Sequence, residues 1–389
     1  MENQRNMTDL PLEVLDRIFR YCGNTVNKVN LAQAHPYFVE AFVYHSRNAF
    51  KDIYYLTGIS MSCWEYILPL CGSNVNLIKR SAYKTNDLSL DNLILQHCHN
   101  LKDISLSFDV EGLNYVSNFI SDKKNSVKSL DLHFKGSRTS EDQIKLLEDL
   151  PDLPHLTKLR IKQTPSDDLH CIQKFINLTE LDLEIVREFY PKVAPADPVD
   201  IFSICAPLKK LRLLKVKGID IASDDPEVNP TLNSLEDLNI VHCDISMEFP
   251  VFPKLKVIQF NYIRTFTSAS LVRKSIINQG ETLERLLFLR GTTPYDGEGL
   301  LELVKGCRKL RYFLAPIHAV KFTLDLVTRL INDLKKNGYT TDDPLELVMD
   351  EYFKLKWLCH WLKFASSEKL IKPRLDEPVE YNLKNYPWY

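Results

Sequence analysis

The chain has 389 residues, of which 44% are apolar and 26% are charged, as in proteins that fold around a buried core. Its formal net charge of −2 gives no general electrostatic attraction for nucleic acid or an anionic membrane, so either partner would require a local patch. The first residues lack the apolar stretch of a secretory signal, and no segment reaches the ~18 uninterrupted apolar residues of a membrane span. Nine cysteines, with no Cys-x-x-Cys pair, favour a reducing compartment. We therefore expect a soluble protein of the cytoplasm or nucleus that binds neither nucleic acid nor membranes.

Short helices are expected near the N-terminus, within residues 8–48 and after a flexible stretch at residues 1–7. The first helix opens at Leu10-Pro11, and its apolar residues recur at helical spacing: Leu15, Ile18, Phe19 and Cys22. A second run at residues 29–42 is unusually apolar and should be divided into two helices at Pro36. Apolar residues on more than one side of short helices are typical of a domain that docks on a partner. The same pattern is expected of a cap that covers the first unit of a repeat array.

An internal repeat fills residues 49–345 in the pattern apolar-x-x-apolar-x-apolar, with a mean period of 26 residues and about 10–11 copies. The clearest copies begin at Leu101, Val127, Leu156, Leu178, Leu208, Leu235, Leu255, Leu283 and Leu310, and weaker ones at Phe50 and Val75. This period, and the full template at residues 235–245, are typical of leucine-rich repeats. Each unit should point two apolar side chains of a short strand inward and cover them with a helix or turn. The sequence therefore predicts an α/β leucine-rich-repeat solenoid, a curved parallel sheet with helices on its convex side.

Three cysteines recur in register with this repeat, each three residues before the first leucine of a unit: Cys98, Cys205 and Cys307. A small buried thiol suits the corner between a helix end and the next strand, which favours a structural role over catalysis or metal binding. His97-Cys98-His99 has no second ligand cluster at the spacing of a zinc site. The sequence also lacks a nucleotide-binding loop, a metalloprotease motif and a nucleophile elbow. We expect no metal, no cofactor, no catalytic residue and no enzyme activity.

The residues between the inward leucines should form the concave surface of the sheet. In three neighbouring units they alternate in sign, which predicts the cross-strand ladders Lys158–Glu180–Lys210 and Arg160–Asp182–Arg212. Such ladders either bind a charged peptide or phosphate or neutralise one another, and the alternating signs favour neutralisation. Later units carry apolar, aromatic and basic residues at these positions, and these form the predicted substrate-binding surface: Val257, Asn261, Arg285, Leu287, Leu289, Tyr312 and Leu314.

Residues 346–389 are expected to close the array with a capping helix followed by an aromatic tail. The helix should present Leu355, Leu358, Trp361 and Leu362 to the core. The tail at residues 385–389 is too short for a core of its own. Two occupants of the apolar concave surface therefore stay open, a substrate and this tail.

The N-terminal segment resembles an F-box. The run Leu10-Pro11-Leu12-Glu13-Val14-Leu15-Asp16-Arg17-Ile18-Phe19 is similar to the opening motif Leu-Pro-x-Glu-Ile/Leu-Leu-x-x-Ile-Phe, and Phe38 keeps a large aromatic in the second half. With a leucine-rich array directly downstream, the whole chain resembles the F-box/leucine-rich-repeat family. The resemblance implies that binding to a Skp-type adaptor, and through it to a cullin–RING ligase, is carried or supported by Leu10, Pro11, Val14, Leu15, Ile18, Phe19 and Phe38.

Two functions of different classes follow. The resemblance implies a non-catalytic substrate-recognition subunit of a Skp–cullin–F-box E3 ubiquitin ligase, whose repeats bind the protein to be ubiquitinated. The alternative is a ligase-independent leucine-rich-repeat scaffold or regulatory protein-binding module, in which the N-terminal helices act only as a cap. Binding of the adaptor to the chain distinguishes the two.

Overall fold

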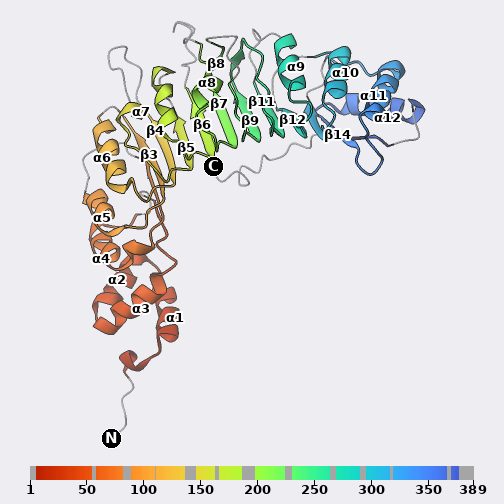
Figure 1. Cartoon of the computed structure of the whole chain (residues 1–389). Helices are drawn as coiled ribbons and strands as arrows, with labels where there is room; N and C mark the ends of the chain where they lie inside the picture. Colours follow the sequence, from red (N-terminus) through yellow and green to blue (C-terminus); the bar gives the residue numbers. More distant parts are fainter. Residues whose placement is uncertain are drawn as a thin grey trace. The chain divides into compact units, whose positions relative to one another are not determined.

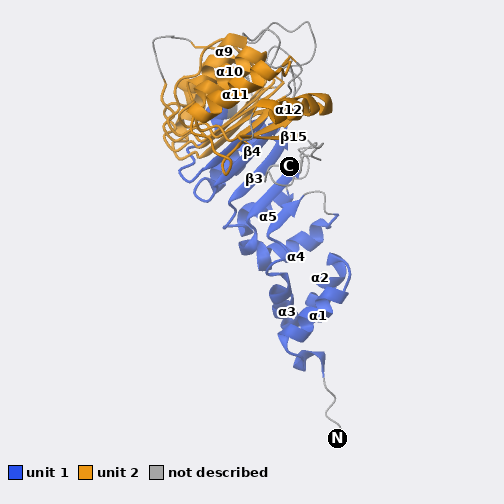
Figure 2. Ribbon diagram, turned by 90° about the vertical axis from the view of Figure 1, so that its right-hand side faces the viewer, with its two compact units in different colours: residues 1–163 blue, residues 164–389 orange. Residues whose placement is uncertain are grey.

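The structure, a computed structural model, divides into two compact units, Met1–Gln163 and Thr164–Tyr389 (Figure 2). The residues that it describes are 6–54, 58–81, 89–109, 111–135, 146–162, 166–185, 198–223, 230–262, 269–289, 295–315, 319–365 and 369–375. Among the helices in these ranges, none combines the length and the apolar character that crossing a bilayer requires.

The first unit begins with helices and continues into strands that alternate with helices (Figure 1). Its helices are η1 (Met7–Asp9), α1 (Leu12–Tyr21), α2 (Thr25–Gln33), α3 (Pro36–Ser46), α4 (Met61–Cys71), η2 (Gly72–Asn74), α5 (Ser89–His97), α6 (Leu113–Lys123) and α7 (Leu146–Asp149). Its strands are β1 (Asp52–Tyr54), β2 (Leu77–Ser81), β3 (Asp103–Phe108), β4 (Ser129–Phe134) and β5 (Lys158–Lys162). They pair in parallel in their chain order.

The second unit repeats the same alternation. Its helices are η3 (Ser166–Lys174), α8 (Ile201–Cys205), α9 (Ala269–Ile277), α10 (Gly297–Gly306), α11 (Leu324–Lys336) and α12 (Tyr352–Ala365). Its main sheet contains β6 (Glu180–Glu184), β7 (Leu213–Lys217), β9 (Asp237–Val241), β11 (Val257–Asn261), β12 (Arg285–Phe288), β13 (Tyr312–Ala315), β14 (Leu345–Met349) and β15 (Ile371–Leu375), all parallel. The short strands β8 (Asp220–Ile221) and β10 (Asp244–Ile245) pair separately.

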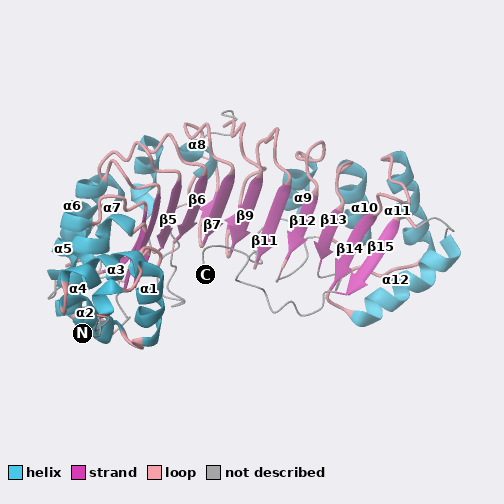
Figure 3. Cartoon of the chain, turned by 90° about the horizontal axis from the view of Figure 1, so that it is seen from below, coloured by secondary structure: helices cyan, strands magenta, loops and turns pink. Residues whose placement is uncertain are grey.

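Alternate strand positions in both units are buried, and the apolar residues of the repeat occupy them. In β6 and β11, for example, the second and fourth residues are buried and the others are partly exposed. Helices α9, α10 and α11 lie on one side of the strands (Figure 3), and the partly exposed strand positions form the opposite side, which we name the open face. The predicted α/β leucine-rich-repeat fold is thus confirmed.

One repeat has a different register from the prediction. The repeat pattern predicts Leu208, Leu211 and Leu213 as inward residues, but strand β7 places Leu214 and Val216 inward and leaves Leu213 partly exposed. Leu213 pairs with Glu180, and Leu214 with the buried Leu181. The segment 208–216 satisfies the pattern in two registers, and the register that buries Leu214 and Val216 is the one adopted.

A residue in the left-handed backbone conformation follows each of three neighbouring strands of the main sheet in the second unit. Gly218 after β7, His242 after β9 and Tyr262 after β11 all have φ between 51° and 75°. At Gly218 this conformation also brings the backbone close to the preceding unit, because a Cβ there would lie 2.1 Å from the carbonyl oxygen of Ile185. Only glycine fits this position without a backbone shift.

The N-terminal helices pack on the first repeat helix through aromatic rings. As predicted, Pro36 begins a new helix, α3. Phe42 of α3 is fully buried, and its ring centroid lies 5.8 Å from that of Phe19 in α1 and 6.2 Å from that of Tyr66 in α4. Phe50 connects the same cluster to Trp64, also on α4. These helices and the first repeat therefore share a core.

The parallel sheet continues beyond residue 345, where the sequence analysis ended the repeats. Strand β14 pairs with β13, and β15 pairs with β14 after the intervening helix α12. Of the residues predicted to face the core from this helix, Leu358 is buried, while Leu355, Trp361 and Leu362 are partly exposed. The aromatic tail at residues 385–389 lies outside the described residues.

Candidate protein-interaction surfaces

Helix α1 has two apolar faces, of which one is buried and one is exposed. Leu15 and Phe19 are fully buried. Val14 is 40% exposed, and Tyr21 is 90% exposed, while Ile18 is partly exposed. Since residues at i, i+4 and i+7 lie on one side of a helix, these three form a continuous stripe. Together with the exposed Pro11 at the N-terminus of the helix, they form what we name the α1 stripe: Pro11, Val14, Ile18 and Tyr21.

Burial divides the predicted adaptor-binding residues into two groups. Leu15, Phe19 and Phe38 are buried, so the supporting part of the predicted role is the one that fits their side chains, which shape the helical core. The exposed or partly exposed members of the prediction are Leu10, Pro11, Val14 and Ile18. Tyr21, which was not among the predicted residues, follows Val14 and Ile18 at helical spacing and extends the exposed face.

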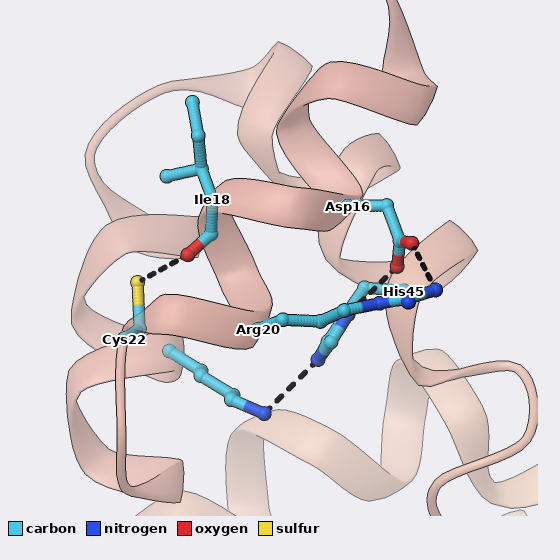
Figure 4. A network of polar contacts seen from close by, with 6 residues as sticks. Asp16, Ile18, Arg20, Cys22 and His45 are labelled. Atoms are coloured by element: carbon cyan, nitrogen blue, oxygen red, sulfur yellow. Dashed lines mark hydrogen bonds and ion pairs between the residues drawn. The ribbon is translucent and has the colours of Figure 1, made fainter.

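Polar contacts fix the position of α1 against its neighbours (Figure 4). His45 Nδ1 lies 2.9 Å from Asp16 Oδ1, and Lys28 Nζ lies 3.0 Å from His45 Nε2. The imidazole of His45 therefore lies between the ammonium group of Lys28 and the carboxylate of Asp16, with one ring nitrogen toward each. The hydrogen bond from His45 and the charge of Arg20, 2.7 Å away, hold the pKa of Asp16 below its usual value. One charged network thus joins α1, α2 and α3.

The start of α1 is also anchored. The Tyr37 hydroxyl of α3 donates a hydrogen bond of 2.8 Å to the carbonyl oxygen of Leu10. On α2, Asn24 accepts from the backbone N–H of Asn27 and caps the helix. The α1 stripe is therefore presented by a fixed backbone.

The predicted substrate-binding residues lie in adjoining rows on the open face of the second unit. Register pairs Val257 with Arg285 and Arg285 with Tyr312 in one row. In the next row, Leu287 pairs with Leu314, between Gln259 and Val348. Asn261 ends β11, and Leu289 directly follows β12, where its N–H donates to the carbonyl of Phe260.

Two residues of this surface differ from the prediction. Leu314 is 6% exposed, so it is not the open contact residue that the sequence suggested. It lies between Leu287 and Val348 on strands roughly 4.8 Å away on either side, which shield its flanks. Val348, 5% exposed, was not predicted on this surface because residues 346–389 were placed beyond the repeats. The alternation of Leu345, Leu347 and Met349 is the sequence signal that would have identified this strand.

The accessible part of this surface is amphipathic. The guanidinium carbon of Arg285, an exposed residue, lies 4.9 Å from the ring centroid of Tyr312. Glu346, the neighbour of Tyr312 in register, forms an ion pair with Arg374. The open face thus brings together a cation, an aromatic ring and the partly exposed Leu287 on neighbouring strands.

The predicted charge ladders form with other partners. The shifted register of β7 places Lys215 beside Asp182, with an ion pair of 3.1 Å, and Lys217 beside Glu184, also ion-paired. Lys210 and Arg212 precede β7 and bond Asn177 and Glu236 instead. Opposite charges on β6 and β7 still neutralise one another, which was the favoured interpretation.

The repeat cysteines are buried thiols. Burial raises the pKa values of Cys98, Cys205 and Cys307 to about 12, so these residues are thiols and not thiolates at neutral pH. Such thiols are poor nucleophiles and metal ligands, and they pack as small apolar groups. Within the described ranges, no group of three or more His, Cys, Asp or Glu side chains is arranged to hold a metal ion.

Comparisons with known proteins give structural neighbours alone. No protein-family model and no curated protein sequence matches the chain. Among solved structures, an internalin (InlF) from Listeria monocytogenes is 14% identical over 95% of this chain and 98% of that chain, with a TM-score of 0.45. A chain of the yeast Rad7–Elc1 complex is 14% identical over 82% of this chain and 78% of that chain, with a TM-score of 0.43.

Proposed function

We propose that the chain is a non-catalytic substrate-recognition subunit of a Skp–cullin–F-box E3 ubiquitin ligase. Residues 8–48 dock on a Skp-type adaptor through the α1 stripe, and the open face of the repeats binds the protein to be ubiquitinated. The observation that carries the proposal is the second apolar face of α1, which stays exposed while Leu15 and Phe19 on the other face form the core. An exposed apolar helix face is what a hydrophobic groove on a partner recognises.

A specific observation favours a second function. The ring contacts of Phe42 with Tyr66, and of Phe50 with Trp64, join the N-terminal helices to the first repeat as a cap would. The second candidate is therefore a scaffold or regulatory protein that never meets the ligase. A cap requires its buried face alone, so the exposed α1 stripe separates the two candidates.

The test changes two residues of the α1 stripe and leaves the buried residues Leu15 and Phe19 unchanged. We expect Val14→Glu/Ile18→Glu to abolish co-purification of the Skp-type adaptor, because burying two unpaired carboxylates in an apolar groove is strongly unfavourable. Thermal unfolding should stay close to wild type, since neither side chain is buried. The measurement is a pull-down of purified adaptor, with unfolding followed by circular dichroism.

The matched control is Ile176→Glu/Val251→Glu, which makes the same chemical change at two exposed apolar residues of the repeats. This variant should retain the adaptor. If the wild type fails to bind the adaptor, the scaffold function replaces the proposal. If the Val14/Ile18 variant still binds, docking does not use the α1 stripe.

The open face gives an independent prediction. Leu287→Ala/Tyr312→Ala should weaken substrate binding at least tenfold, because large side chains at interface centres often contribute 2 kcal/mol or more, about thirtyfold in affinity. The measurement is recovery of proteins that accumulate on the receptor while the ligase is blocked. Leu213→Ala/Tyr54→Ala is the matched control, since Leu213 lies on β7 and the exposed Tyr54 on β1, and neither strand pairs with β12, β13 or β14. Equal recovery with both variants, or loss of folding in the first, contradicts this placement of the substrate site.

A further inference from the structure

Helix α12 exposes a row of aromatic side chains. Phe353 is 74% exposed, and Trp357 and Phe364 are each more than half exposed. With the exposed His360 they follow the spacing i, i+4, i+7 and i+11, which places all four on one helix face. The ring of His360 contacts both Trp361 and Phe364, so the row is continuous along the helix.

This row lies on the outer side of α12, which is the last helix among the described residues of the second unit. Helix α12 packs on α11, β14 and β15 through its other side, where Leu358 is buried (Figure 3). Terminal helices of repeat arrays usually carry a polar outer face, because no further unit covers them. The outer face of α12 is instead aromatic, an arrangement that is costly in water unless a partner covers it.

The charged residues of α12 are all lysines. Lys354, Lys356 and Lys363 lie within Tyr352–Ala365, and this segment has no aspartate, glutamate or arginine. Lys356 and Lys363, seven residues apart, run beside the aromatic row on one edge, and Lys356 Nζ lies 4.6 Å from the ring centroid of Tyr352. Lys354 binds the carbonyl of Val320. The nearest acidic residues in sequence, Asp350 and Glu351, precede the first turn.

This composition distinguishes between kinds of partner. Protein interfaces favour arginine and deplete lysine, whereas the boundary of a lipid bilayer favours tryptophan, tyrosine and phenylalanine beside flexible lysines that reach the headgroups. Single-stranded nucleic acid also stacks on aromatic rings, but such sites form a positively charged groove along the strand. On α12 the lysines instead lie along one edge of an exposed aromatic row. This arrangement fits a planar anionic surface better than a nucleic-acid strand.

We propose that the outer face of α12 binds an anionic lipid surface, with Phe353, Trp357 and Phe364 entering the headgroup region and Lys356 and Lys363 contacting acidic headgroups. The contact is peripheral and local to this helix. The chain's net charge of −2 excludes a general attraction to such a surface, and α12 supplies the local patch that an attraction needs. The proposal is independent of adaptor binding, which uses α1.

The test is co-sedimentation of the full chain with vesicles of phosphatidylcholine alone or with phosphatidylserine added. The wild type should bind the vesicles that contain phosphatidylserine and should dissociate from them at high salt. It should bind vesicles of phosphatidylcholine alone only weakly. Lys356→Gln/Lys363→Gln should lower partitioning roughly thirtyfold, and Phe353→Ala/Trp357→Ala should lower it to the level of neutral vesicles. Lys305→Gln/Lys309→Gln, the same charge change at exposed lysines on and just after α10, should bind as wild type does.

Folding of each variant is checked by circular dichroism, and because the substituted side chains are exposed, their spectra should match wild type. Absence of vesicle binding by the wild type overturns the proposal. So does unchanged binding by the Phe353/Trp357 variant. Binding of a thymidine oligonucleotide without vesicle binding assigns the face to nucleic acid, and self-association that only the aromatic variant loses, again without vesicle binding, assigns it to a second copy of the chain.

Discussion

Replacing Asp91 by leucine should lower the free energy of unfolding by about 3–5 kcal/mol, because the change leaves a buried guanidinium without its counter-ion. Arg80 of β2 occupies a buried strand position that other repeats fill with leucine or isoleucine. It forms an ion pair with Asp91 of α5, and its guanidinium carbon lies 5.3 Å from the ring centroid of Tyr115 on α6. Chemical denaturation followed by circular dichroism measures the loss.

The other single variant, Arg80→Leu, should have a free energy of unfolding that depends on pH. Burial raises the pKa of Asp91 to about 7, against the lowering effect of a hydrogen bond with Tyr115. Removing the adjacent guanidinium should raise this pKa further, because a neighbouring cation favours the charged carboxylate. In Arg80→Leu, the raised pKa means that the folded state retains a proton that the unfolded chain releases near pH 4. The stability of this variant should therefore be highest in acid and fall as pH rises through the folded pKa.

The double variant separates the ion pair from its packing. Arg80→Leu/Asp91→Leu should recover most of the stability lost in either single variant, since apolar replacement of a buried pair is often neutral or stabilising. The control is Asp333→Leu on α11. It removes a mostly buried carboxylate whose ion-pair partner, Lys336, is exposed and therefore stays solvated. A double variant as unstable as Asp91→Leu would show that the pair is not the source of the effect.

The repeat pattern predicted the fold because the same two inward positions recur in nearly every unit. It failed where a segment satisfies the pattern twice, as at Leu208–Leu211–Leu213 and Leu211–Leu214–Val216. Sequence spacing treats these registers as equal, and the burial of Leu214 together with pairing to Leu181 decides between them. The β7 side of the charge ladders shifted with the register, so basic residues do face β6, but they are Lys215 and Lys217 and not Lys210 and Arg212.

The interaction surfaces show a different limit of sequence analysis. Helical spacing identified α1, but an apolar helix with two apolar faces does not reveal which face enters the core, so Leu15 and Phe19 were grouped with Val14. Buried polar residues are harder still. Arg80 and Asp91 are eleven positions apart on different elements, and the charged pair inside the core becomes visible only when β2 and α5 are packed together.

Replacing Phe42 by alanine should cost about 3–5 kcal/mol, as expected for a fully buried phenylalanine. The expected consequence goes beyond α3, because Phe42 touches Phe19 on one side and Tyr66 of α4 on the other. Hydrogen exchange should therefore accelerate in α1 and α3 and also in α4. Val39→Ala, a smaller change at a partly exposed position of the same helix, should leave α4 protected.

Hydrogen exchange in the Phe42→Ala variant also shows whether the N-terminal helices and the first repeat share one core or form separate domains. If protection of α4 is lost together with that of α1, the N-terminal helices and the first repeat open as one cooperative unit. An adaptor bound at the α1 stripe would then stabilise the first repeat as well, by mass action on the folded state. If α4 keeps its protection while α1 and α3 open, the ring contacts do not couple the two, and the helices behave as an independent docking domain.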